Sequence, residues 1–235
     1  MHDIQNVYSD FIDRLKKTAS GIPVLLSAGA VYGVLQLLFY PLLGVIAVGA
    51  GAILVSLMRW ILQLAFFSFF AGLMLHLLRY HRLRLDQLKQ WDTSYIGPLS
   101  QLFFLLWIVE VLFGLLPLPS ELKALILLIW HVFTAPAFEA VYFGNVYPQN
   151  IFSFLTGFWS DNYLAILPFA VAVILVSQFR FTGSFLLRFL GPGAGANYII
   201  LGIAEAFYLY LKGVLFSILF NSTPRSREFR RRASH

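Results

Sequence analysis

The sequence predicts an all-α, polytopic transmembrane bundle of about six spans with an N-terminal interfacial helix, and three observations predict it. First, the 235-residue chain is 59% hydrophobic and 12% charged, with a mean hydropathy of +0.77, whereas a typical soluble domain is about 25% charged. Second, several uncharged runs are long enough to cross a hydrocarbon core of about 30 Å. Third, these runs lack the alternation of barrel strands, so helices are the structure that pairs every backbone group in lipid.

The first element expected is an amphipathic helix over residues 1–20. Its apolar stripe at helical spacing consists of Val7, Tyr8, Phe11, Ile12 and Leu15. Acidic and basic residues occupy the remaining faces. This pattern is typical of a helix that lies in the headgroup layer of a membrane.

The first two spans must come from one long uncharged run. Residues 22–58 contain no charge, and as a single helix they would extend about 55 Å, well beyond the hydrocarbon core. Small residues dominate the stretch Gly44–Ala52, just after Pro41. We therefore expect a break there and spans at about 22–46 and 53–78.

The remaining apolar runs predict four further spans. These are expected at about 98–116, 123–146, 162–178 and 198–221. Pro136 and Pro168 fall inside two of them and are expected to kink their helices, because proline lacks a backbone donor. The amphipathic, aromatic-rich stretch 151–163 is expected to lie at the interface. The chain is thus expected to be a single integral membrane domain, 1–235, that ends in a basic tail, 222–235.

The basic residues orient the bundle and mark contacts with lipid. Most of them lie before the first span, after the second span and in the C-terminal tail, and these segments fall on one side of a six-span bundle. By the positive-inside rule, both termini are expected to be cytoplasmic. Basic residues next to a span attract anionic headgroups by about 1 kcal/mol each. The arginines expected to contact anionic lipid are Arg79, Arg82, Arg84, Arg230, Arg231 and Arg232.

Six ionisable residues fall inside the expected spans, where charge is costly and usually meets a partner or water. At a rise of 1.5 Å per residue, four of them lie about 9–12 Å from the outer ends of their spans, and two lie about 10–13 Å from the inner ends. We therefore predict two clusters. The outer cluster is Arg59 with Glu110 and Glu205, with His131 nearby, and the inner cluster is Glu139 with Lys212.

Three interpretations of these clusters stay open. The pairs serve only to hold helices together; or Arg59 and Lys212 snorkel to an interface while the acids are protonated; or the residues form a path for an ion or a substrate. A lone intramembrane imidazole such as His131 is more often a hydrogen-bonded packing residue than a ligand. No second histidine lies within helical reach of it in the sequence, which argues against a metal site.

The short motifs do not indicate catalysis. The stretch His81–Asp86 matches the H-x-x-x-x-D pattern of glycerolipid acyltransferases, but chance produces such a match in about one of eight comparable sequences. The glycine-rich run 191–197 follows no strand, so a turn before the last span is the better interpretation. Gly29 and Gly33 form a small-residue pair that favours close packing within the bundle over dimerisation.

Composition excludes several classes of protein. The chain has no cysteine, which excludes disulfides, thiol catalysis and cysteine-based metal sites. Its basic residues adjoin hydrophobic spans, so membrane lipids rather than nucleic acid are the expected partners. The polar segments are too short for a nucleotide-binding domain, and neither a metal nor another cofactor is expected.

The layout of the chain resembles that of a bacterial family. Six expected spans, a basic turn after the second, the stretch FEAVYFGNVYPQNIFSFLTGFWSDNYLAILPFA and the ending LKGVLFSILFNSTPRSRE carry the resemblance. They are similar to the six-span membrane domain that precedes some glycerophosphoryl diester phosphodiesterases, and to its stand-alone relatives. The resemblance implies a non-catalytic domain in the bacterial inner membrane and transfers no site residue. The sequence contains no phosphodiesterase domain, so that activity is not expected.

Together these observations favour a non-enzymatic, multi-pass membrane protein that acts as a membrane-embedded component of a larger complex or transport system, with protein partners in the membrane. One alternative is a small ion-coupled transporter or channel that uses the intramembrane glutamates and His131. A second alternative is a lipid-modifying enzyme or accessory centred on His81 and Asp86 or on the basic turn.

Overall fold

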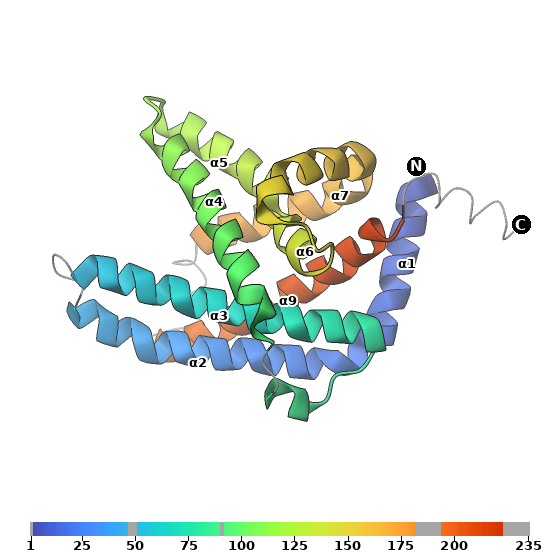
Figure 1. Cartoon of the computed structure of the whole chain (residues 1–235), viewed down its shortest axis with the longest axis horizontal. Coiled ribbons are helices and arrows are strands. Elements are labelled where there is room, and N and C mark those ends of the chain that lie inside the picture. Colours follow the sequence, from blue (N-terminus) through green and yellow to red (C-terminus); the bar gives the residue numbers. More distant parts are fainter. Residues whose placement is uncertain (1, 47–50, 90–91, 182–193, 223–235) are drawn as a thin grey trace, which may run out of the picture. The chain divides into compact units, whose positions relative to one another are not determined.

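The computed structural model of the chain describes the backbone of residues 2–46, 51–89, 92–181 and 194–222 (Figure 1). Side chains are described for residues 4–38, 57–84, 86–89, 92–166, 168–169 and 197–222. Within these ranges every regular element is a helix, so the chain is all-α, as the sequence predicts.

The helices follow one another in this order along the described chain. They are α1 (His2–Thr18), η1 (Ala19–Gly21), α2 (Ile22–Ile46), α3 (Gly51–Tyr80), η2 (Leu85–Lys89), η3 (Thr93–Tyr95), α4 (Ile96–Leu115), α5 (Ser120–Thr134), α6 (Ala137–Tyr142), η4 (Pro148–Asn150), α7 (Ile151–Phe181) and α9 (Ala194–Phe220), where η marks a short 3₁₀ helix.

Five stretches of the described residues are long and apolar enough to cross a membrane, which makes the chain a polytopic helical membrane protein. They are Ile4–Leu38, Leu57–Tyr80, Thr93–Leu115, Ser120–Tyr142 and Asn197–Phe220. The sixth expected span, about 162–178, begins inside α7, but its side chains from residue 170 onward lie outside the described residues.

Helix boundaries agree with the sequence for the first three spans. α2 covers the expected span 22–46, α3 covers 53–78, and α4 covers 98–115. The break expected within Gly44–Ala52 separates α2 from α3, and residues 47–50 lie outside the described residues. Long uncharged runs thus predict where a helix ends to within a few residues, because the thickness of the membrane sets the length of its apolar segment.

Two later regions differ from the expectation. The expected span 123–146 is two helices, since α5 ends at Thr134 and α6 begins after Pro136, where a missing N–H interrupts the backbone ladder. Conversely, the amphipathic stretch 151–163 and the start of the next span form one continuous helix, α7. This helix runs through Pro168, and the kink expected there stays a prediction.

The chain divides into two compact units, each built from segments that are far apart in the sequence. Unit 1 comprises residues 1–14, 97–182 and 215–235, and unit 2 comprises residues 15–96 and 183–214, in each case as far as they are described.

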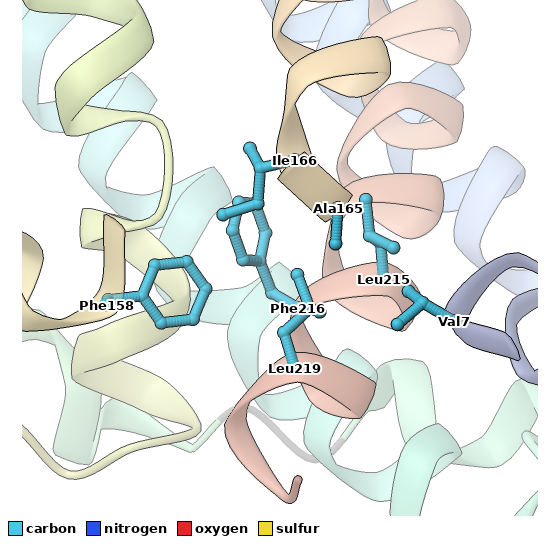
Figure 2. Close-up of a cluster of buried hydrophobic side chains, with 7 residues drawn as sticks. All are labelled: Val7, Phe158, Ala165, Ile166, Leu215, Phe216 and Leu219. Carbon is cyan, nitrogen blue, oxygen red and sulfur yellow. The ribbon is translucent and has the colours of Figure 1, made fainter. Parts of the chain in front are cut away.

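In the core of unit 1, α7 packs against α1 and the last turns of α9 (Figure 2). Its buried apolar cluster consists of Val7, Phe158, Ala165, Ile166, Leu215, Phe216 and Leu219. Aromatic rings extend the cluster, and Phe154 stacks on Phe220 with ring centroids 5.1 Å apart. Close packing of this kind holds helices together in lipid, where apolar burial alone gives no driving force.

The apolar stripe of α1 packs partly against this core. Val7 is fully buried, and the Tyr8 hydroxyl donates to the Ala165 carbonyl over 3.2 Å. Arg14 Nη1 donates to Ser217 Oγ over 2.9 Å. Ile12 remains 51% exposed. The helix expected from the stripe is therefore confirmed, one part of its apolar face is covered by the chain itself, and its place in the headgroup layer stays a prediction.

Unit 2 is organised around close contact between α2 and the first half of α9. A Cβ atom on Gly29 would meet the Gly202 carbonyl oxygen and would lie 2.6 Å from the Ala206 Cβ, and one on Gly33 would meet the backbone at Tyr198. These glycines therefore let two helix backbones touch. The expected internal packing of the Gly29 and Gly33 pair is confirmed.

Helix α3 runs beside α2 in the same unit (Figure 1). The rings of Tyr32 in α2 and Phe66 in α3 stack with centroids 4.1 Å apart, and both side chains are buried. A Cβ on Gly21, just before α2, would lie 2.5 Å from Leu77 of α3, so these helices also approach closely at this end.

Candidate functional site

Helices α4 and α5 form a hairpin in unit 1, joined by residues 116–119 (Figure 1). Prolines at 117 and 119 end one helix and begin the next, and Pro119 precedes the first residue of α5. Lys123 Nζ donates to the Gly114 carbonyl over 2.8 Å, and the rings of Phe113 and Trp130 meet edge to face at 5.6 Å. These contacts hold the two helices of the hairpin together near its closed end.

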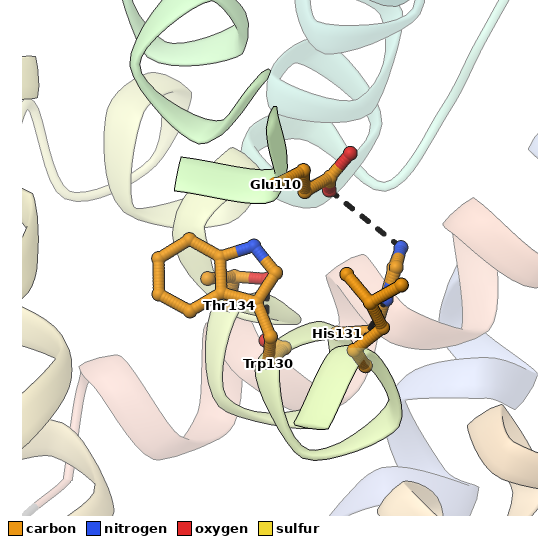
Figure 3. A network of polar contacts seen from close by, with 5 residues as sticks. Glu110, Trp130, His131 and Thr134 are labelled. Carbon is orange, nitrogen blue, oxygen red and sulfur yellow. Dashed lines mark hydrogen bonds and ion pairs between the residues drawn. The ribbon is translucent and has the colours of Figure 1, made fainter. Parts of the chain in front are cut away.

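Glu110 of α4 and His131 of α5 face one another across this hairpin (Figure 3). Glu110 Oε1 lies 3.7 Å from His131 Nε2, which is an ion-pair distance and too long for a hydrogen bond. The other ring nitrogen, Nδ1, lies 2.6 Å from the Leu127 carbonyl oxygen, one helical turn back. The structure thus brings together two of the four residues expected in the outer cluster.

The contact with the Leu127 carbonyl shows which ring nitrogen of His131 carries a proton. A carbonyl only accepts, so Nδ1 is the donor in that contact, and Nε2 is left facing the carboxylate. With a proton on Nε2 as well, His131 is an imidazolium that pairs with the Glu110 carboxylate. The pair then carries no net charge, which lowers the cost of placing it in lipid.

Helix α5 packs against α7 on one side, where Trp159 Nε1 donates to the Phe133 carbonyl, but the described residues leave the Glu110–His131 pair exposed. The exposed fraction of the side chain is 39% for Glu110 and 54% for His131. Only Leu99 and Leu102 are buried in α4, both in its first half, and no residue of α5 is buried. By contrast, all six residues of the adjoining α6 are buried. The exposed large apolar residues of the hairpin are Phe104, Trp107, Val111, Leu112, Leu115, Leu116, Leu122, Leu125 and Ile129.

The other expected partners of the outer cluster belong to unit 2. Arg59 lies on an exposed face of α3, and Glu205 is half-buried in α9. Each has an interaction within the structure. Their pairing with one another, and with Glu110, stays a prediction.

The two residues of the inner cluster are both buried. Glu139 is 1% exposed in α6 of unit 1, and Lys212 is 6% exposed in α9 of unit 2. Lys212 Nζ lies 5.7 Å from the centroid of the Tyr208 ring, which is one turn earlier in the same helix, so the ammonium is within cation–π range of that ring. The direct pairing of Glu139 with Lys212 stays a prediction.

A polar pocket at the C-terminal end of α3 was not expected from the sequence. It has a volume of about 380 Å³ and lies within unit 2. Its walls are the last turns of α3 together with Gln87 of η2, Asp92, and Tyr95 of η3. Six of its residues are polar: His76, Arg79, Tyr80, Gln87, Asp92 and Tyr95. The apolar positions are Gly72, Leu73 and Leu75.

The chain reversal that forms this pocket depends on His81. Its φ angle is 56°, in the left-handed region, and its backbone N–H donates to the Leu77 carbonyl over 2.8 Å. The Ser20 hydroxyl donates to the His81 carbonyl over 3.4 Å. His81 therefore ends α3 through its backbone, in the manner of a C-terminal cap.

Hydrogen bonds then position the polar groups of the pocket. Gln87 Oε1 accepts from the Arg84 N–H over 3.0 Å, which leaves the Gln87 amide nitrogen 2.6 Å from His76 Nε2. Asp92 Oδ1 accepts from the Ser94 N–H over 2.9 Å, and hydrogen bonds from the Ser94 side chain and backbone lower the pKa of Asp92 from its ordinary value of 3.8. The Asp92 carboxylate is therefore ionised at neutral pH.

The arginines expected to contact anionic lipid occupy different places. Arg79 borders the pocket, while Arg82 and Arg84 are exposed in the segment that follows α3. The tail arginines at 230–232 lie outside the described residues, as does most of the glycine-rich run 191–197. Their expected roles stay predictions.

Neither a metal site nor the acyltransferase pattern finds support in the described residues. No three metal-ligating side chains gather among them. His81 acts through its backbone at the end of α3, and Asp86 is exposed in η2. The sequence could not reveal the pocket, because the spacing of residues 72 to 95 does not show that the chain reverses between them.

Comparison with known proteins gives no match to a family model, to a curated protein or to a solved structure. The resemblance to the six-span membrane domain therefore stays a prediction. Among the described residues, the α4–α5 hairpin and the α3 pocket are two sites where polar side chains gather.

Proposed function

We propose that the chain is a non-enzymatic, membrane-embedded component of a larger assembly, and that it binds a partner membrane protein through the α4–α5 hairpin. The single observation that supports this function is the Glu110–His131 pair, because the described residues leave it exposed although it lies on a hairpin of two candidate membrane-spanning helices. Exposed apolar side chains alone would be expected to contact lipid. Polar side chains inside a membrane-spanning segment usually face protein or water instead.

The chemistry of Glu110 indicates what the partner presents. Only Oε1 of the carboxylate meets His131, and within the described residues Oε2 has no hydrogen-bonding neighbour. A carboxylate accepts most strongly from a cationic donor. The proposed partner is therefore a membrane protein with a transmembrane helix that carries Lys or Arg at the depth of Glu110.

A second copy of the chain fits this requirement less well. Three of the cations in its own candidate spans are already engaged: Lys123 donates to Gly114, Lys212 is buried against Tyr208, and Arg59 has its own interaction. A different protein is therefore the proposed occupant of the hairpin surface.

Site-specific photo-crosslinking in native membranes tests this function. A crosslinking amino acid at Leu112, which is 56% exposed on α4, should give one discrete product with a second membrane protein. The matched control is Leu38 of α2, which is also 56% exposed and should give crosslinks to lipid only. Peptide mapping of the product at position 112 should locate a transmembrane segment that carries Lys or Arg.

A pair of charge-removing variants shows whether the carboxylate matters. Glu110→Gln should reduce the crosslink at Leu112 at least several-fold, because the amide has no negative charge for the partner's cation. Glu121→Gln makes the same change on an exposed residue of the same hairpin and should leave the yield unchanged. An absent crosslink at Leu112, or equal yields in the two variants, contradicts the proposed function. A product of twice the chain's mass would replace the partner by a second copy.

The same pair is the observation that favours the ion-coupled alternative, because an acid and an imidazole that lie 3.7 Å apart in candidate membrane-spanning helices are groups that can exchange protons. A carrier predicts proton-coupled flux in liposomes that contain the purified chain, and loss of this flux in Glu110→Gln. The assembly function predicts no flux from the chain alone, so the liposome assay separates the two.

A further inference from the structure

The polar pocket at the end of α3 contains two opposite charges that do not neutralise one another directly. Arg79 and Asp92 both border it, and no ion pair joins these two described residues. Tyr95 lies within electrostatic reach of both. A ligand with only a negative charge would meet Asp92, and one with only a positive charge would meet Arg79. A ligand with both charges would complement both residues.

Neighbouring groups supply further contacts for each half of such a ligand. The Gln87 amide N–H₂ can only donate, so His76 Nε2 accepts and the ring proton lies on Nδ1, where it can donate to a phosphate oxygen. The rings of Tyr80 and Tyr95 also border the pocket. Aromatic faces attract an ammonium group by about 0.5–1 kcal/mol at exposed sites.

The pocket lies at the depth of lipid headgroups. Tyr80 is the last residue of a candidate span, and Arg79 lies in the last turn of that helix. The end of a membrane-spanning helix is where tyrosine and arginine meet the headgroup layer. With a volume of about 380 Å³, the cavity is at the small end of the range for ligand pockets, which suits a headgroup rather than a whole lipid.

We propose that this pocket binds the headgroup of a zwitterionic phospholipid, with the phosphate beside Arg79 and His76 and the ammonium beside Asp92 and the tyrosine rings. The assignment differs from general attraction of anionic lipid, because the carboxylate is part of the site. It is also independent of the partner proposed for the α4–α5 hairpin, since the pocket belongs to unit 2.

Lipid binding to the delipidated full-length chain in detergent tests the proposal. Native mass spectrometry should show tighter binding of dioleoyl-phosphatidylethanolamine than of dioleoyl-phosphatidylglycerol, which has the phosphate but no ammonium. Arg79→Gln should weaken both lipids about tenfold, because it removes a charge-assisted contact with the shared phosphate. Asp92→Asn should weaken phosphatidylethanolamine about tenfold and leave phosphatidylglycerol unchanged or tighter.

Two controls keep the result specific. Arg82→Gln removes the same charge three residues beyond Arg79 but outside the pocket, and it should change neither affinity by more than about twofold. Asparagine is as good a cap as aspartate, so Asp92→Asn should retain the contact with Ser94 and the unfolding temperature of the parent.

Three results would overturn the proposal. They are equal binding of the two lipids by the parent chain, the same loss in Arg82→Gln as in Arg79→Gln, and an unchanged lipid preference in Asp92→Asn. Soluble glycerophosphoethanolamine, added at the lipid's concentration, identifies the source of the headgroup. Failure to compete supports the lipid, whereas full competition would support the headgroup site and overturn its assignment to a lipid.

Discussion

The described helices of unit 2 bury much of their surface against one another, whereas the α4–α5 hairpin of unit 1 packs against α7 on one side and leaves much of its remaining surface exposed. In unit 2, α2 and α9 touch backbone to backbone at Gly29 and Gly202. In the hairpin, α5 buries no residue. The candidate spans of both regions are apolar, so hydrophobicity does not distinguish them. In lipid the difference comes from small residues and shape, because apolar burial gives little driving force there.

We expect the greatest loss of stability from a substitution in the contact between α2 and α9. Gly29→Leu should prevent stable packing of α2 against α9, because the new side chain would meet the Gly202 backbone and the Ala206 Cβ, neither of which can rotate away. Overpacking of rigid cores typically costs about 1–3 kcal/mol and more when backbone must move. We expect a large fall in the unfolding temperature of the purified protein, or loss of the folded protein from membranes.

The matched control for this substitution is Gly157→Leu. A Cβ on Gly157 has no neighbour within 4 Å, and the residue is exposed in the second turn of α7. Leucine has the higher helix propensity, so this variant should be as stable as the parent or slightly more so. Equal destabilisation by the two variants would show that α2 and α9 do not make the contact described above.

The contact between α2 and α9 also shows which part of the packing can be predicted from the sequence. Spacing alone predicts that Gly29 and Gly33 lie on one face and favour internal packing, and the structure confirms it. Spacing does not identify their partner, because Gly202 is about 170 residues away and its pair with Ala206 is one of several small-residue pairs in the sequence. Helix ends were similarly predictable where apolar length decides them. At Pro136 the sequence predicted a kink, and the structure has an interruption between α5 and α6 there.

A smaller effect is expected from two pairs of stacked rings. Phe66 is 6% exposed and stacks on Tyr32 at 4.1 Å, while Phe104 is 55% exposed and stacks on Trp107 at 5.9 Å. Phe→Ala costs about 3–5 kcal/mol in soluble cores, and the part due to lost packing remains in lipid. Phe66→Ala should therefore destabilise the protein by at least about 2 kcal/mol, and Phe104→Ala by less than about 1 kcal/mol.

Reversible unfolding in mixed micelles measures both ring variants. Crosslinking in native membranes adds a second measurement, because Phe104 lies on the surface proposed to bind a partner. Phe104→Ala should lower the crosslink at Leu112 even though it costs less than about 1 kcal/mol of stability. A stability loss equal to that of Phe66→Ala would mean that the hairpin is covered by its own chain.

The candidate site was less predictable than the fold. Depth counting placed Glu110 and His131 in one layer, and they do meet. It could not reveal that they lie on an uncovered hairpin, since burial depends on which helices pack together. The pocket residues His76 and Asp92 drew no attention in the sequence, because each is an ordinary polar residue until the left-handed turn at His81 brings its segment back.

We expect the least change in stability from titration of Asp92, whose carboxylate accepts a hydrogen bond from Ser94. Asp92 accepts hydrogen bonds from Ser94, and these lower its pKa below the ordinary value of 3.8. A lowered pKa in the folded state means that the stabilisation is fully present above the unfolded pKa and is lost as the pH falls through the folded one. Between pH 7 and about pH 5, stability should therefore not change through this group.

Below about pH 4 the parent should lose less than about 0.5 kcal/mol through Asp92, because solvent screens an exposed carboxylate. Asp92→Asn keeps a cap that does not titrate, so its stability should lack this acid-dependent part. Comparing the two proteins in mixed micelles from pH 5 to pH 3 cancels the contributions of the other acids. A difference that appeared instead near neutral pH would show that Asp92 is not held by Ser94. The contrast with Glu110, whose second oxygen has no hydrogen-bonding neighbour in the described chain, would then lose its basis.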